Sequence, residues 1–385
     1  MKTKFKILHV GKFFPPYPGG IEYFLADLVK AQSKLENQVW ALVHGSPLSF
    51  RTKKEKKGDV LVFYAPCWGQ VFYAPLAPSF PWLYFRLLSS YKPDIIHLHL
   101  PNTSAFSALL FSKLQKGKVV LHWHADVVPS QIDRGLSLLY RFYRPFERAL
   151  IKRADLIVAT SPPYLETSKA LAPFRFKTKI IPLGLDPSRL YAGVNSKKGS
   201  KMPLKSSFVL SVGRFTYYKG FEYLLSALEF LPPEVKLCLV GHGKLKNFLL
   251  EKIKKQKLKN RVFLFEQVED EVLHKLFASC VLFCLPSIER TEAFGLVLLE
   301  AMVFGKPLVT TSVVGSGMNW VNVHGKTGLV VPPAHPKALA EAIYTIFQDP
   351  SLAQEMGRRA KRRFEERFHI QKVAQEIQKS YLELF

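Results

Sequence analysis

Residues 207–241, SFVLSVGRFTYYKGFEYLLSALEFLPPEVKLCLVG, contain the unit from which the fold of this chain can be inferred. An apolar run at 207–213 ends in glycine and is followed by a loop with Arg214 and Lys219. Apolar residues then recur at helical spacing, up to a second apolar run at 235–241. Continuous runs of Val, Leu and Phe are typical of strands in a parallel sheet that is covered on both faces. The segment therefore predicts a strand, a helix and a second strand.

The same alternation extends through the chain. Further apolar runs lie at 5–11, 38–45, 59–65, 94–100, 118–126, 155–160 and 178–183, and then at 261–268, 281–287, 306–312 and 327–333. The Gly-, Ser- and Lys-rich stretch 191–206 interrupts them. We predict an α/β chain with two doubly wound, Rossmann-like domains, 1–187 and 207–365, facing across a cleft. A linker or surface excursion at 188–206 would join them, and a C-terminal helix at 366–385 is able to cross back to the first domain.

Composition supports this organisation and narrows the function. With 385 residues, 48% hydrophobic and 22% charged, the chain is long enough for two cores and too apolar for extended disorder. A net charge of +25 favours anionic partners such as nucleic acid, acidic lipids or phosphorylated small molecules. The four cysteines lie in apolar runs without a C-x-x-C pair, and no apolar stretch is long enough to span a membrane. We expect buried free thiols, a cytoplasmic location and at most peripheral contact with a membrane.

Ligands of open parallel sheets bind beyond the carboxyl ends of the strands, so the loops there hold the candidate residues. After the first strand, Gly19 and Gly20 open a helix at Ile21, where bare N–H groups can receive a phosphate. A tight turn without a ligand is the alternative. The chain has no G-x-G-x-x-G motif at this position.

Histidines are concentrated at the ends of two consecutive strands, as His97, His99, His122 and His124. In a period of two, His122 and His124 face the same side. Such a cluster of histidines is compatible with a zinc site, but no nearby Cys or Glu completes a familiar ligand spacing, so we expect no metal. His124, the last of its strand, is the candidate for a catalytic or hydrogen-bonding group, while His97 and His122 are expected to pack within the sheet.

In the second half, Arg214 and Lys219 follow a strand and precede a helix, where two cations suit a diphosphate. Solvated surface charge is the alternative for both. A second glycine turn, at Gly241, follows the next strand and is expected close to the same edge of the sheet.

The segment 286–310, PSIERTEAFGLVLLEAMVFGKPLVT, places Glu292 before a helix that should begin near Phe294, with Glu300 inside it. Eight residues at roughly 100° each return to within about 80° of the starting direction, so both carboxylates can face one pocket. The first N–H groups of the helix favour an anion there. Carboxylates for sugar hydroxyls beside N–H groups for phosphates would hold a nucleotide sugar. For Glu292 alone, helix capping is the alternative.

Taken in order, these motifs resemble the retaining glycosyltransferases of the GT-B fold known as family 4. The resemblance covers almost the whole chain and rests on seven segments: PPYPGGIE, DIIHLHLP, HWHAD, VGRFTYYKGFEYLL, LVGHGKL, PSIERTEAFGLVLLEAMVFGKPLVTT and HGKTGLVVPP. Glu292 to Glu300 matches the E-x7-E signature of that family. The chain departs from it at 313–328, VVGSGMNWVNVHGKTG, where the usual GG-x-x-E acidic residue is missing and Asn319 and Asn322 stand nearby.

The resemblance implies a hexosyltransferase-like enzyme that uses a UDP- or GDP-sugar and no metal or other cofactor. The catalytic residues it implies are His124, Arg214, Lys219 and Glu292. The donor-binding residues it implies are Gly19, Gly20, Arg214, Lys219, Gly241, Val268, Glu292, Phe294, Gly295, Leu296 and Glu300. Arg214, Lys219 and the helix N-terminus would stabilise the departing diphosphate. Retention would follow from a front-face reaction in which the leaving phosphate accepts the proton.

Alternatives on the same architecture are a nucleotide-sugar epimerase and a glycogen-synthase-like polymerase. A nucleic-acid-binding protein would explain the charge but not E-x7-E, and no RNP motif is found.

Aromatic, leucine and basic residues interleave at 79–93 and 136–155 in a way that suits a helix on anionic lipid. A core-packed helix with a solvated basic face is the alternative. A membrane-bound helix would favour a glycan or lipid-linked acceptor, in lipopolysaccharide, exopolysaccharide or glycolipid assembly.

Overall fold

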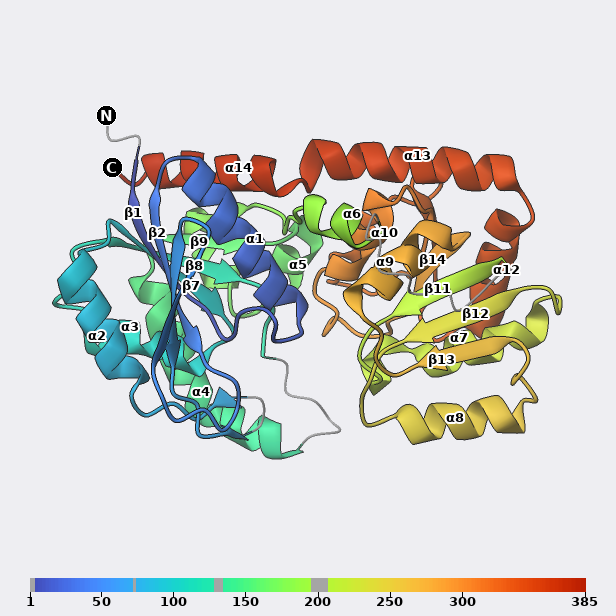
Figure 1. Ribbon diagram of the computed structural model, residues 1–385, viewed down its shortest axis with the longest axis horizontal. Coiled ribbons are helices and arrows are strands. Elements are labelled where there is room, and N and C mark those ends of the chain that lie inside the picture. Colours follow the sequence, from blue (N-terminus) through green and yellow to red (C-terminus); the bar gives the residue numbers. More distant parts are fainter. Residues whose placement is uncertain (1–3, 72–73, 128–133, 195–206) are drawn as a thin grey trace. The chain divides into compact units, whose positions relative to one another are not determined.

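The computed structural model describes residues 4–71, 74–127, 134–194 and 207–385. The chain divides into two compact units, each with its own parallel sheet (Figure 1). Unit 1 comprises Met1–Gly184 together with Ile370–Phe385, and unit 2 comprises Leu185–His369. The two predicted Rossmann-like sheets are confirmed, and each unit is described by itself below.

Unit 1 contains an eight-stranded sheet in the order β10-β9-β8-β7-β1-β2-β4-β3, parallel except for β3. Its strands are β1 (Lys6–Val10), β2 (Gln38–His44), β3 (Lys53–Lys57), β4 (Val60–Ala65), β7 (Ile95–Leu100), β8 (Lys118–Trp123), β9 (Leu156–Ala159) and β10 (Thr178–Ile180). A separate two-stranded antiparallel sheet pairs β5 (Gln70–Val71) with β6 (Ala74–Pro75). Its helices are α1 (Gly20–Lys34), α2 (Phe80–Tyr91), η1 (Thr103–Phe106), α3 (Ser107–Leu110), α4 (Arg134–Arg153), α5 (Pro162–Thr167), η2 (Ala172–Lys177) and α14 (Ile370–Leu382). The chain order reverses between β1 and β7, which makes the carboxyl ends of these strands a topological switch point.

The edge of this sheet departs from the predicted alternation. Between 45 and 59 the chain forms the antiparallel strand β3 instead of a helix. The sequence of β3 is KKEKK, and its side chains are largely exposed. Charged residues on an edge strand discourage pairing with another molecule, so this strand closes the sheet with little hydrophobic signal in its sequence.

The last helix, α14, packs against α1 in unit 1, as Figure 1 shows, so the predicted return of the chain to the first domain is confirmed. Tyr381 of α14 is fully buried, and its ring lies edge-on to Phe5, with 6.0 Å between the centroids. A segment from the end of the chain therefore completes the N-terminal core.

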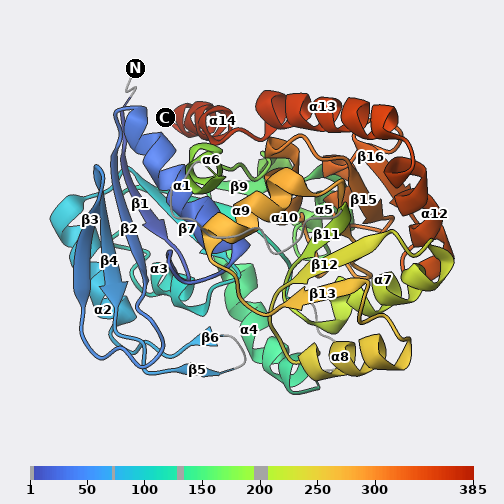
Figure 2. The ribbon, with the colours of Figure 1, turned by 45° about the vertical axis from the view of Figure 1, so that its right-hand side comes forward.

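Unit 2 contains a six-stranded parallel sheet in the order β13-β12-β11-β14-β15-β16 (Figure 2). Its strands are β11 (Phe208–Val212), β12 (Lys236–Val240), β13 (Val262–Phe265), β14 (Leu282–Leu285), β15 (Leu308–Thr311) and β16 (Gly328–Val331). Its helices are α6 (Ser188–Val194), η3 (Tyr217–Lys219), α7 (Phe221–Ala227), η4 (Leu228–Phe230), α8 (Lys246–Lys255), α9 (Asp270–Ser279), α10 (Leu296–Val303), α11 (Met318–Val321), α12 (Pro336–Phe347) and α13 (Pro350–Arg367). The switch point lies between β11 and β14.

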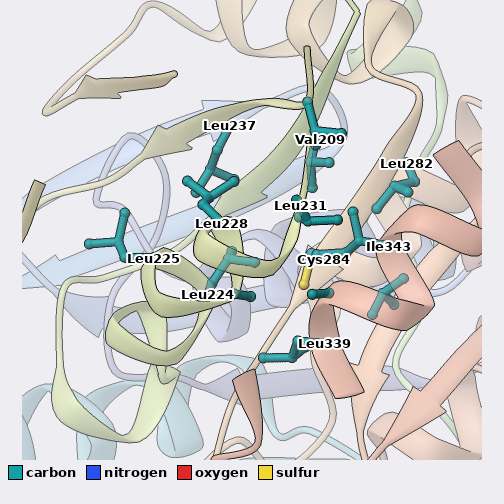
Figure 3. Close-up of a cluster of buried hydrophobic side chains, with 14 of the residues drawn as sticks. Val209, Leu224, Leu225, Leu228, Leu231, Leu237, Leu282, Cys284, Leu339 and Ile343 are labelled. Carbon is teal, nitrogen blue, oxygen red and sulfur yellow. The ribbon is translucent and has the colours of Figure 1, made fainter. Parts of the chain in front are cut away.

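The core of unit 2 is built from leucines of the predicted apolar runs. Leu224 of α7 and Leu339 of α12 pack with Leu237 of β12 and Leu282 of β14, and all four are buried (Figure 3). These helices cover one face of the sheet, and most sheet residues on that face are apolar. The core holds the carboxyl ends of β11 and β14 side by side.

The predicted linker is partly helical. Residues 188–194 form α6, which packs against α9 within unit 2. The rest of the predicted linker, 195–206, lies outside the described residues.

Two smaller expectations concern the cysteines and the membrane. All four cysteines are buried free thiols, as predicted. Within the residues that the structure describes, no helix combines the length and the apolar character that crossing a bilayer requires.

Candidate active site

Lys219 lies where two loops of unit 2 meet at the switch point. It ends the short helix η3 after β11, and only 8% of it is exposed. The next residue, Gly220, has φ 66°, and a Cβ there would lie 2.2 Å from the carbonyl oxygen of Pro286. Since only glycine permits this approach, Gly220 lets the loop after β11 contact the loop after β14.

Lys219 forms an ion pair with Glu292, whose side chain is also mostly buried. Glu292 comes from the loop after β14, and Ser287 of that loop donates a weak hydrogen bond of 3.5 Å to its carboxylate. The structure thus brings together two residues that the sequence predicted 73 positions apart. It places a cation and a carboxylate in direct contact at the carboxyl ends of the two central strands.

The segment that departs from the family pattern supports the Glu292 loop. The hydroxyl of Ser316 donates a hydrogen bond to the carbonyl oxygen of Glu292, and the N–H of Gly317 donates to that of Ala293 over 2.8 Å. Asn322 is buried, and its amide donates to Thr310 over 2.9 Å. Ser316 and Gly317 therefore hold the backbone of the acidic loop, a role that the sequence did not indicate.

Glycines also bring the loops after β11 and β12 together. A Cβ at Gly241 would lie 1.9 Å from the carbonyl oxygen of Gly213, and the N–H of Phe215 donates to the carbonyl of His242 over 2.7 Å. The expectation that Gly241 lies near the Arg214–Lys219 loop agrees with this geometry. Arg214 itself is exposed at the surface of that loop.

The helix α10 begins at Leu296, two residues later than predicted, after Gly295 in a left-handed conformation (φ 80°). Its first N–H groups have no intrahelical acceptor, and its dipole is positive at this end. Phe294 is buried directly before it. A helix N-terminus beside Lys219 can attract an anion, which is the arrangement that the sequence predicted.

Glu300, the second carboxylate of E-x7-E, lies 3.4 Å from the guanidinium of Arg189. Arg189 belongs to α6, within the segment predicted as a linker, so no local pattern indicated this contact. Only the packing of α6 on α9 brings Arg189 to α10.

Val268, which was predicted to bind the donor, lies in the loop between β13 and α9, and no described contact assigns it a role.

In unit 1, Gly19 and Gly20 begin α1, as predicted. A Cβ at Gly19 would lie 2.1 Å from a carboxylate oxygen of Glu22, so this acidic side chain folds over the first turn. A carboxylate at a helix N-terminus is favoured by the dipole. Any phosphate approaching Gly19 would therefore meet Glu22, which was not among the predicted site residues.

His124 belongs to a stack of five buried histidines on one face of the sheet. His9 pairs in register with His97, and His99 with His122, so the five side chains point the same way. The rings of His122 and His124 lie 4.5 Å apart at 8°. Burial lowers the pKa of His124 to about 3, so its imidazole is neutral at pH 7.

The atoms of His99, His122 and His124 that could ligate a metal lie within 4.8 Å of one another. The three rings, however, are stacked within 16° of parallel. A metal ion must lie close to the plane of each imidazole that ligates it, because the lone pair lies in that plane, and parallel stacked rings do not offer a tetrahedral set. The cluster has the geometry of a hydrogen-bonded stack and does not fit a zinc ion.

Two acidic residues of unit 1 were missed as site candidates. Asp126 accepts hydrogen bonds from Trp123 (2.8 Å) and Ser168 (2.7 Å). Glu147 of α4 is buried, and desolvation, reinforced by the charge of Asp126, raises its pKa to about 7. Glu147 stands in the strongly basic sequence of α4, and no pattern in that sequence predicts that its side chain faces inward.

Comparison with known proteins agrees with this architecture. Residues 18–189 match the family described as Glycosyltransferase Family 4, and residues 195–363 match Glycosyl transferases group 1. A D-rhamnosyltransferase, WbpZ of Pseudomonas aeruginosa, is 33% identical over 74% of this chain and 72% of its own length. An O-antigen chain mannosyltransferase C from Escherichia coli is 29% identical over 94% of both chains.

Among solved structures, HepE of Anabaena in complex with UDP-glucose is similar with a TM-score of 0.75, at 22% identity, covering 98% of this chain and 100% of that one. This likeness concerns the fold. The family matches, the related sequences and the two Rossmann-like sheets together show that the chain is a retaining glycosyltransferase of family 4 with the GT-B fold.

Proposed function

We propose that this enzyme transfers a hexose or 6-deoxyhexose from a nucleoside-diphosphate sugar to a hydroxyl of a lipid-linked glycan in polysaccharide assembly. The donor would be a UDP- or GDP-sugar, bound by unit 2 without a metal. The observation that carries the proposal is the Lys219–Glu292 pair at the switch point, beside the N-terminus of α10.

The chemistry of that site suits a diphosphate sugar. Lys219 and the first N–H groups of α10 offer positive charge where the leaving diphosphate becomes more negative. Glu292 offers acceptors for sugar hydroxyls, and Glu300 of α10 would bind the ribose. The exposed Arg214 would add a second cation to the phosphates.

The sugar and its destination are inferred from the relatives. Two of them, at 33% and 29% identity, are named as a rhamnosyl- and a mannosyltransferase, the latter of O-antigen chains. Transfer to a polysaccharide intermediate is therefore the natural expectation for this chain. Such an intermediate requires access to a lipid anchor.

A face of unit 1 supports a lipid-linked acceptor. A pocket of about 470 Å³ between β6, α2, α3 and α4 is lined mostly by apolar residues, among them Leu76, Leu110 and Phe146. These three side chains are 46–71% exposed. Apolar side chains that are left open to water at a pocket mouth are suited to the alkyl region of a lipid.

Basic residues of α4 line another hollow of unit 1. A second hollow of about 680 Å³ is lined by Tyr140, Arg141, Arg144, Pro145, Arg148, Ala149 and Lys152. The three arginines are exposed, and Phe142 between them is 69% exposed. Exposed aromatic and basic side chains together suit the interface of an anionic membrane, where the phosphate groups of lipids meet the arginines.

Thermal-shift titration with UDP-, GDP-, ADP- and dTDP-sugars tests the donor, since a ligand that binds only the folded state raises Tm. The proposal expects one UDP- or GDP-sugar to stabilise the enzyme, and it expects the shift to vanish in Lys219→Met but persist in Lys254→Met, an exposed lysine of α8. A shift that survives Lys219→Met, or none with any of these donors, would overturn it.

A further inference from the structure

Seven side chains in unit 1 form one continuous hydrogen-bonded chain that ends at His124. From His124, Nε2 lies 3.0 Å from Nδ1 of His99, and Nε2 of His99 lies 3.0 Å from Nδ1 of His9. Nε2 of His9 lies 2.7 Å from Oε1 of Gln32, whose amide nitrogen donates to Tyr381 over 3.1 Å.

The chain continues from Tyr381 to a second end. The hydroxyl of Tyr381 lies 2.5 Å from Nδ1 of His97, and Nε2 of His97 lies 3.2 Å from Nδ1 of His122. The two terminal atoms, Nδ1 of His124 and Nε2 of His122, are buried and have no hydrogen-bond partner among the described residues.

Every imidazole of the chain is neutral at pH 7. Burial lowers the pKa of His9 to about 4, and it lowers the pKa values of His97, His99 and His122 well below 6.5. A neutral imidazole has one N–H and one bare nitrogen. Within the chain, each ring can therefore donate at one side only, and each must accept at the other.

Gln32 sets the direction in which the hydrogen bonds run. Its oxygen can only accept and its nitrogen can only donate, whereas either nitrogen of an imidazole can carry the proton. Its Oε1 can only accept, so His9 must hold its proton on Nε2. His9 Nδ1 then accepts from Nε2 of His99, and His99 Nδ1 accepts from Nε2 of His124. The proton of His124 is thus placed on Nε2, and its Nδ1 is left with a lone pair.

The other branch follows from the amide nitrogen of Gln32. Because this N–H donates to Tyr381, the hydroxyl of Tyr381 donates to His97 Nδ1, and His97 Nε2 donates to His122. His122 accepts at Nδ1 and therefore holds its one ring proton on Nε2. Rotation of the Gln32 amide by 180° would reverse both branches and exchange the properties of the two ends.

We propose that Gln32 is a positioning residue that acts through His9 and His99 to hold His124 as a hydrogen-bond acceptor at Nδ1. This inference rests on the proposed function and on the catalytic role that the family resemblance implies for His124, in contact with the transferred sugar or the reacting oxygens. Such a His124 would select a hydroxyl as its partner, because a bare nitrogen accepts from O–H and repels an oxygen without a proton. Two imidazoles, those of His9 and His99, lie between the amide of Gln32 and the ring of His124.

Imidazole ¹⁵N NMR of the full-length protein tests this directly, because bare and protonated ring nitrogens have distinct shifts. His124 is assigned from the resonances lost in His124→Asn. We expect a bare Nδ1 and a protonated Nε2 in the unmodified protein. In Gln32→Met, which removes both the acceptor and the donor, we expect the His124 resonances to move toward a protonated Nδ1.

Tyr381→Phe removes the hydroxyl that links Gln32 to His97, so the resonances of His97 and His122 should move, which tests the other branch if Gln32→Met does not fold. Gln378→Met is the matched control, since Gln378 lies at the same α1–α14 contact but bonds to Asn37, outside the chain. Its His124 resonances should not move. A protonated Nδ1 in the unmodified protein, or unchanged His124 resonances in Gln32→Met, would overturn the proposal.

Kinetics separate this inference from the proposed function. In Gln32→Met, where the proton of His124 moves to Nδ1, kcat should fall about ten-fold, as expected for one lost hydrogen bond in the transition state. The affinity for free nucleoside diphosphate should stay the same. If His124→Asn kept full activity, the role of His124 at the sugar would be wrong although the NMR result could still hold. If the His124 resonances did not change in Gln32→Met, the proposed role of Gln32 would be wrong and the transferase assignment would stand.

Discussion

Lys219 and Glu292 form a mostly buried ion pair that joins the loops after the two central strands of unit 2. Removing one partner from such a pair leaves an unpaired buried charge, while removing both does not. This asymmetry allows the structural role of the pair to be separated from its role in transfer.

Lys219→Met and Glu292→Gln should each destabilise unit 2 by roughly 3 kcal/mol, and the double variant should recover most of that loss. Transfer should stay at least about 100-fold reduced in all three, since the double variant restores no charge for the diphosphate or the sugar. Urea unfolding and initial rates provide the two measurements. A double variant that recovers activity together with stability would mean that the pair is only structural.

Substitution by alanine should reduce stability more at Gly220 than at a glycine whose only requirement is a positive φ. Gly220→Ala adds a Cβ 2.2 Å from the Pro286 carbonyl and should cost more than about 3 kcal/mol, with loss of donor binding. Gly325 has φ 70° with open space around it, so Gly325→Ala should cost only about 1 kcal/mol. Equal losses in urea midpoints would contradict the close approach of the two loops.

Unit 1 should lose stability as the pH falls below about 6.5. The five stacked histidines have pKa values lowered by burial in the folded state, so below 6.5 the unfolded chain binds more protons and is favoured. Each contributes up to about 1.4 kcal/mol per pH unit, and stability should be flat above pH 7.5. Hydrogen exchange of unit 1 peptides at pH 8, 7, 6 and 5 measures this, and equal protection at pH 5 and pH 7 would rule it out.

Binding to anionic vesicles should depend on α4. Charge reversal of Arg141, Arg144 and Arg148 should abolish co-sedimentation with phosphatidylglycerol vesicles at low salt, because each basic residue near the surface contributes about 1 kcal/mol. Reversal of the exposed lysines 254, 255 and 259 in unit 2 serves as the control for net charge and should preserve binding. Equal loss in both triple variants would show that only the overall charge matters.

The sheets could be predicted because their strands are continuous apolar runs whose burial on both faces leaves a clear signal. The edge strand β3 could not, since KKEKK has no apolar periodicity and is extended only through its pairing with β4. The return of α14 to unit 1 was anticipated only as an option. Its packing against α1 depends on contacts between the two ends of the chain.

For the site, local patterns identified the loops but not all their partners. Lys219 and Glu292 were predicted because both follow strands. Arg189 was missed, because only tertiary packing brings α6 to Glu300. His122 and His124 were placed on one side by their spacing, but the addition of His9 requires the β1–β7 register, which no local pattern contains.

The anomeric configuration of the product tests the central claim most directly. An anomerically pure UDP- or GDP-sugar that stabilises the enzyme would be incubated with a lipid-linked glycan acceptor and followed by ¹H NMR, with and without EDTA. The account predicts a new glycosidic bond of the same configuration as the donor, formed only with acceptor present and unaffected by EDTA. An inverted linkage, or conversion of the donor to an epimer without acceptor, would contradict it.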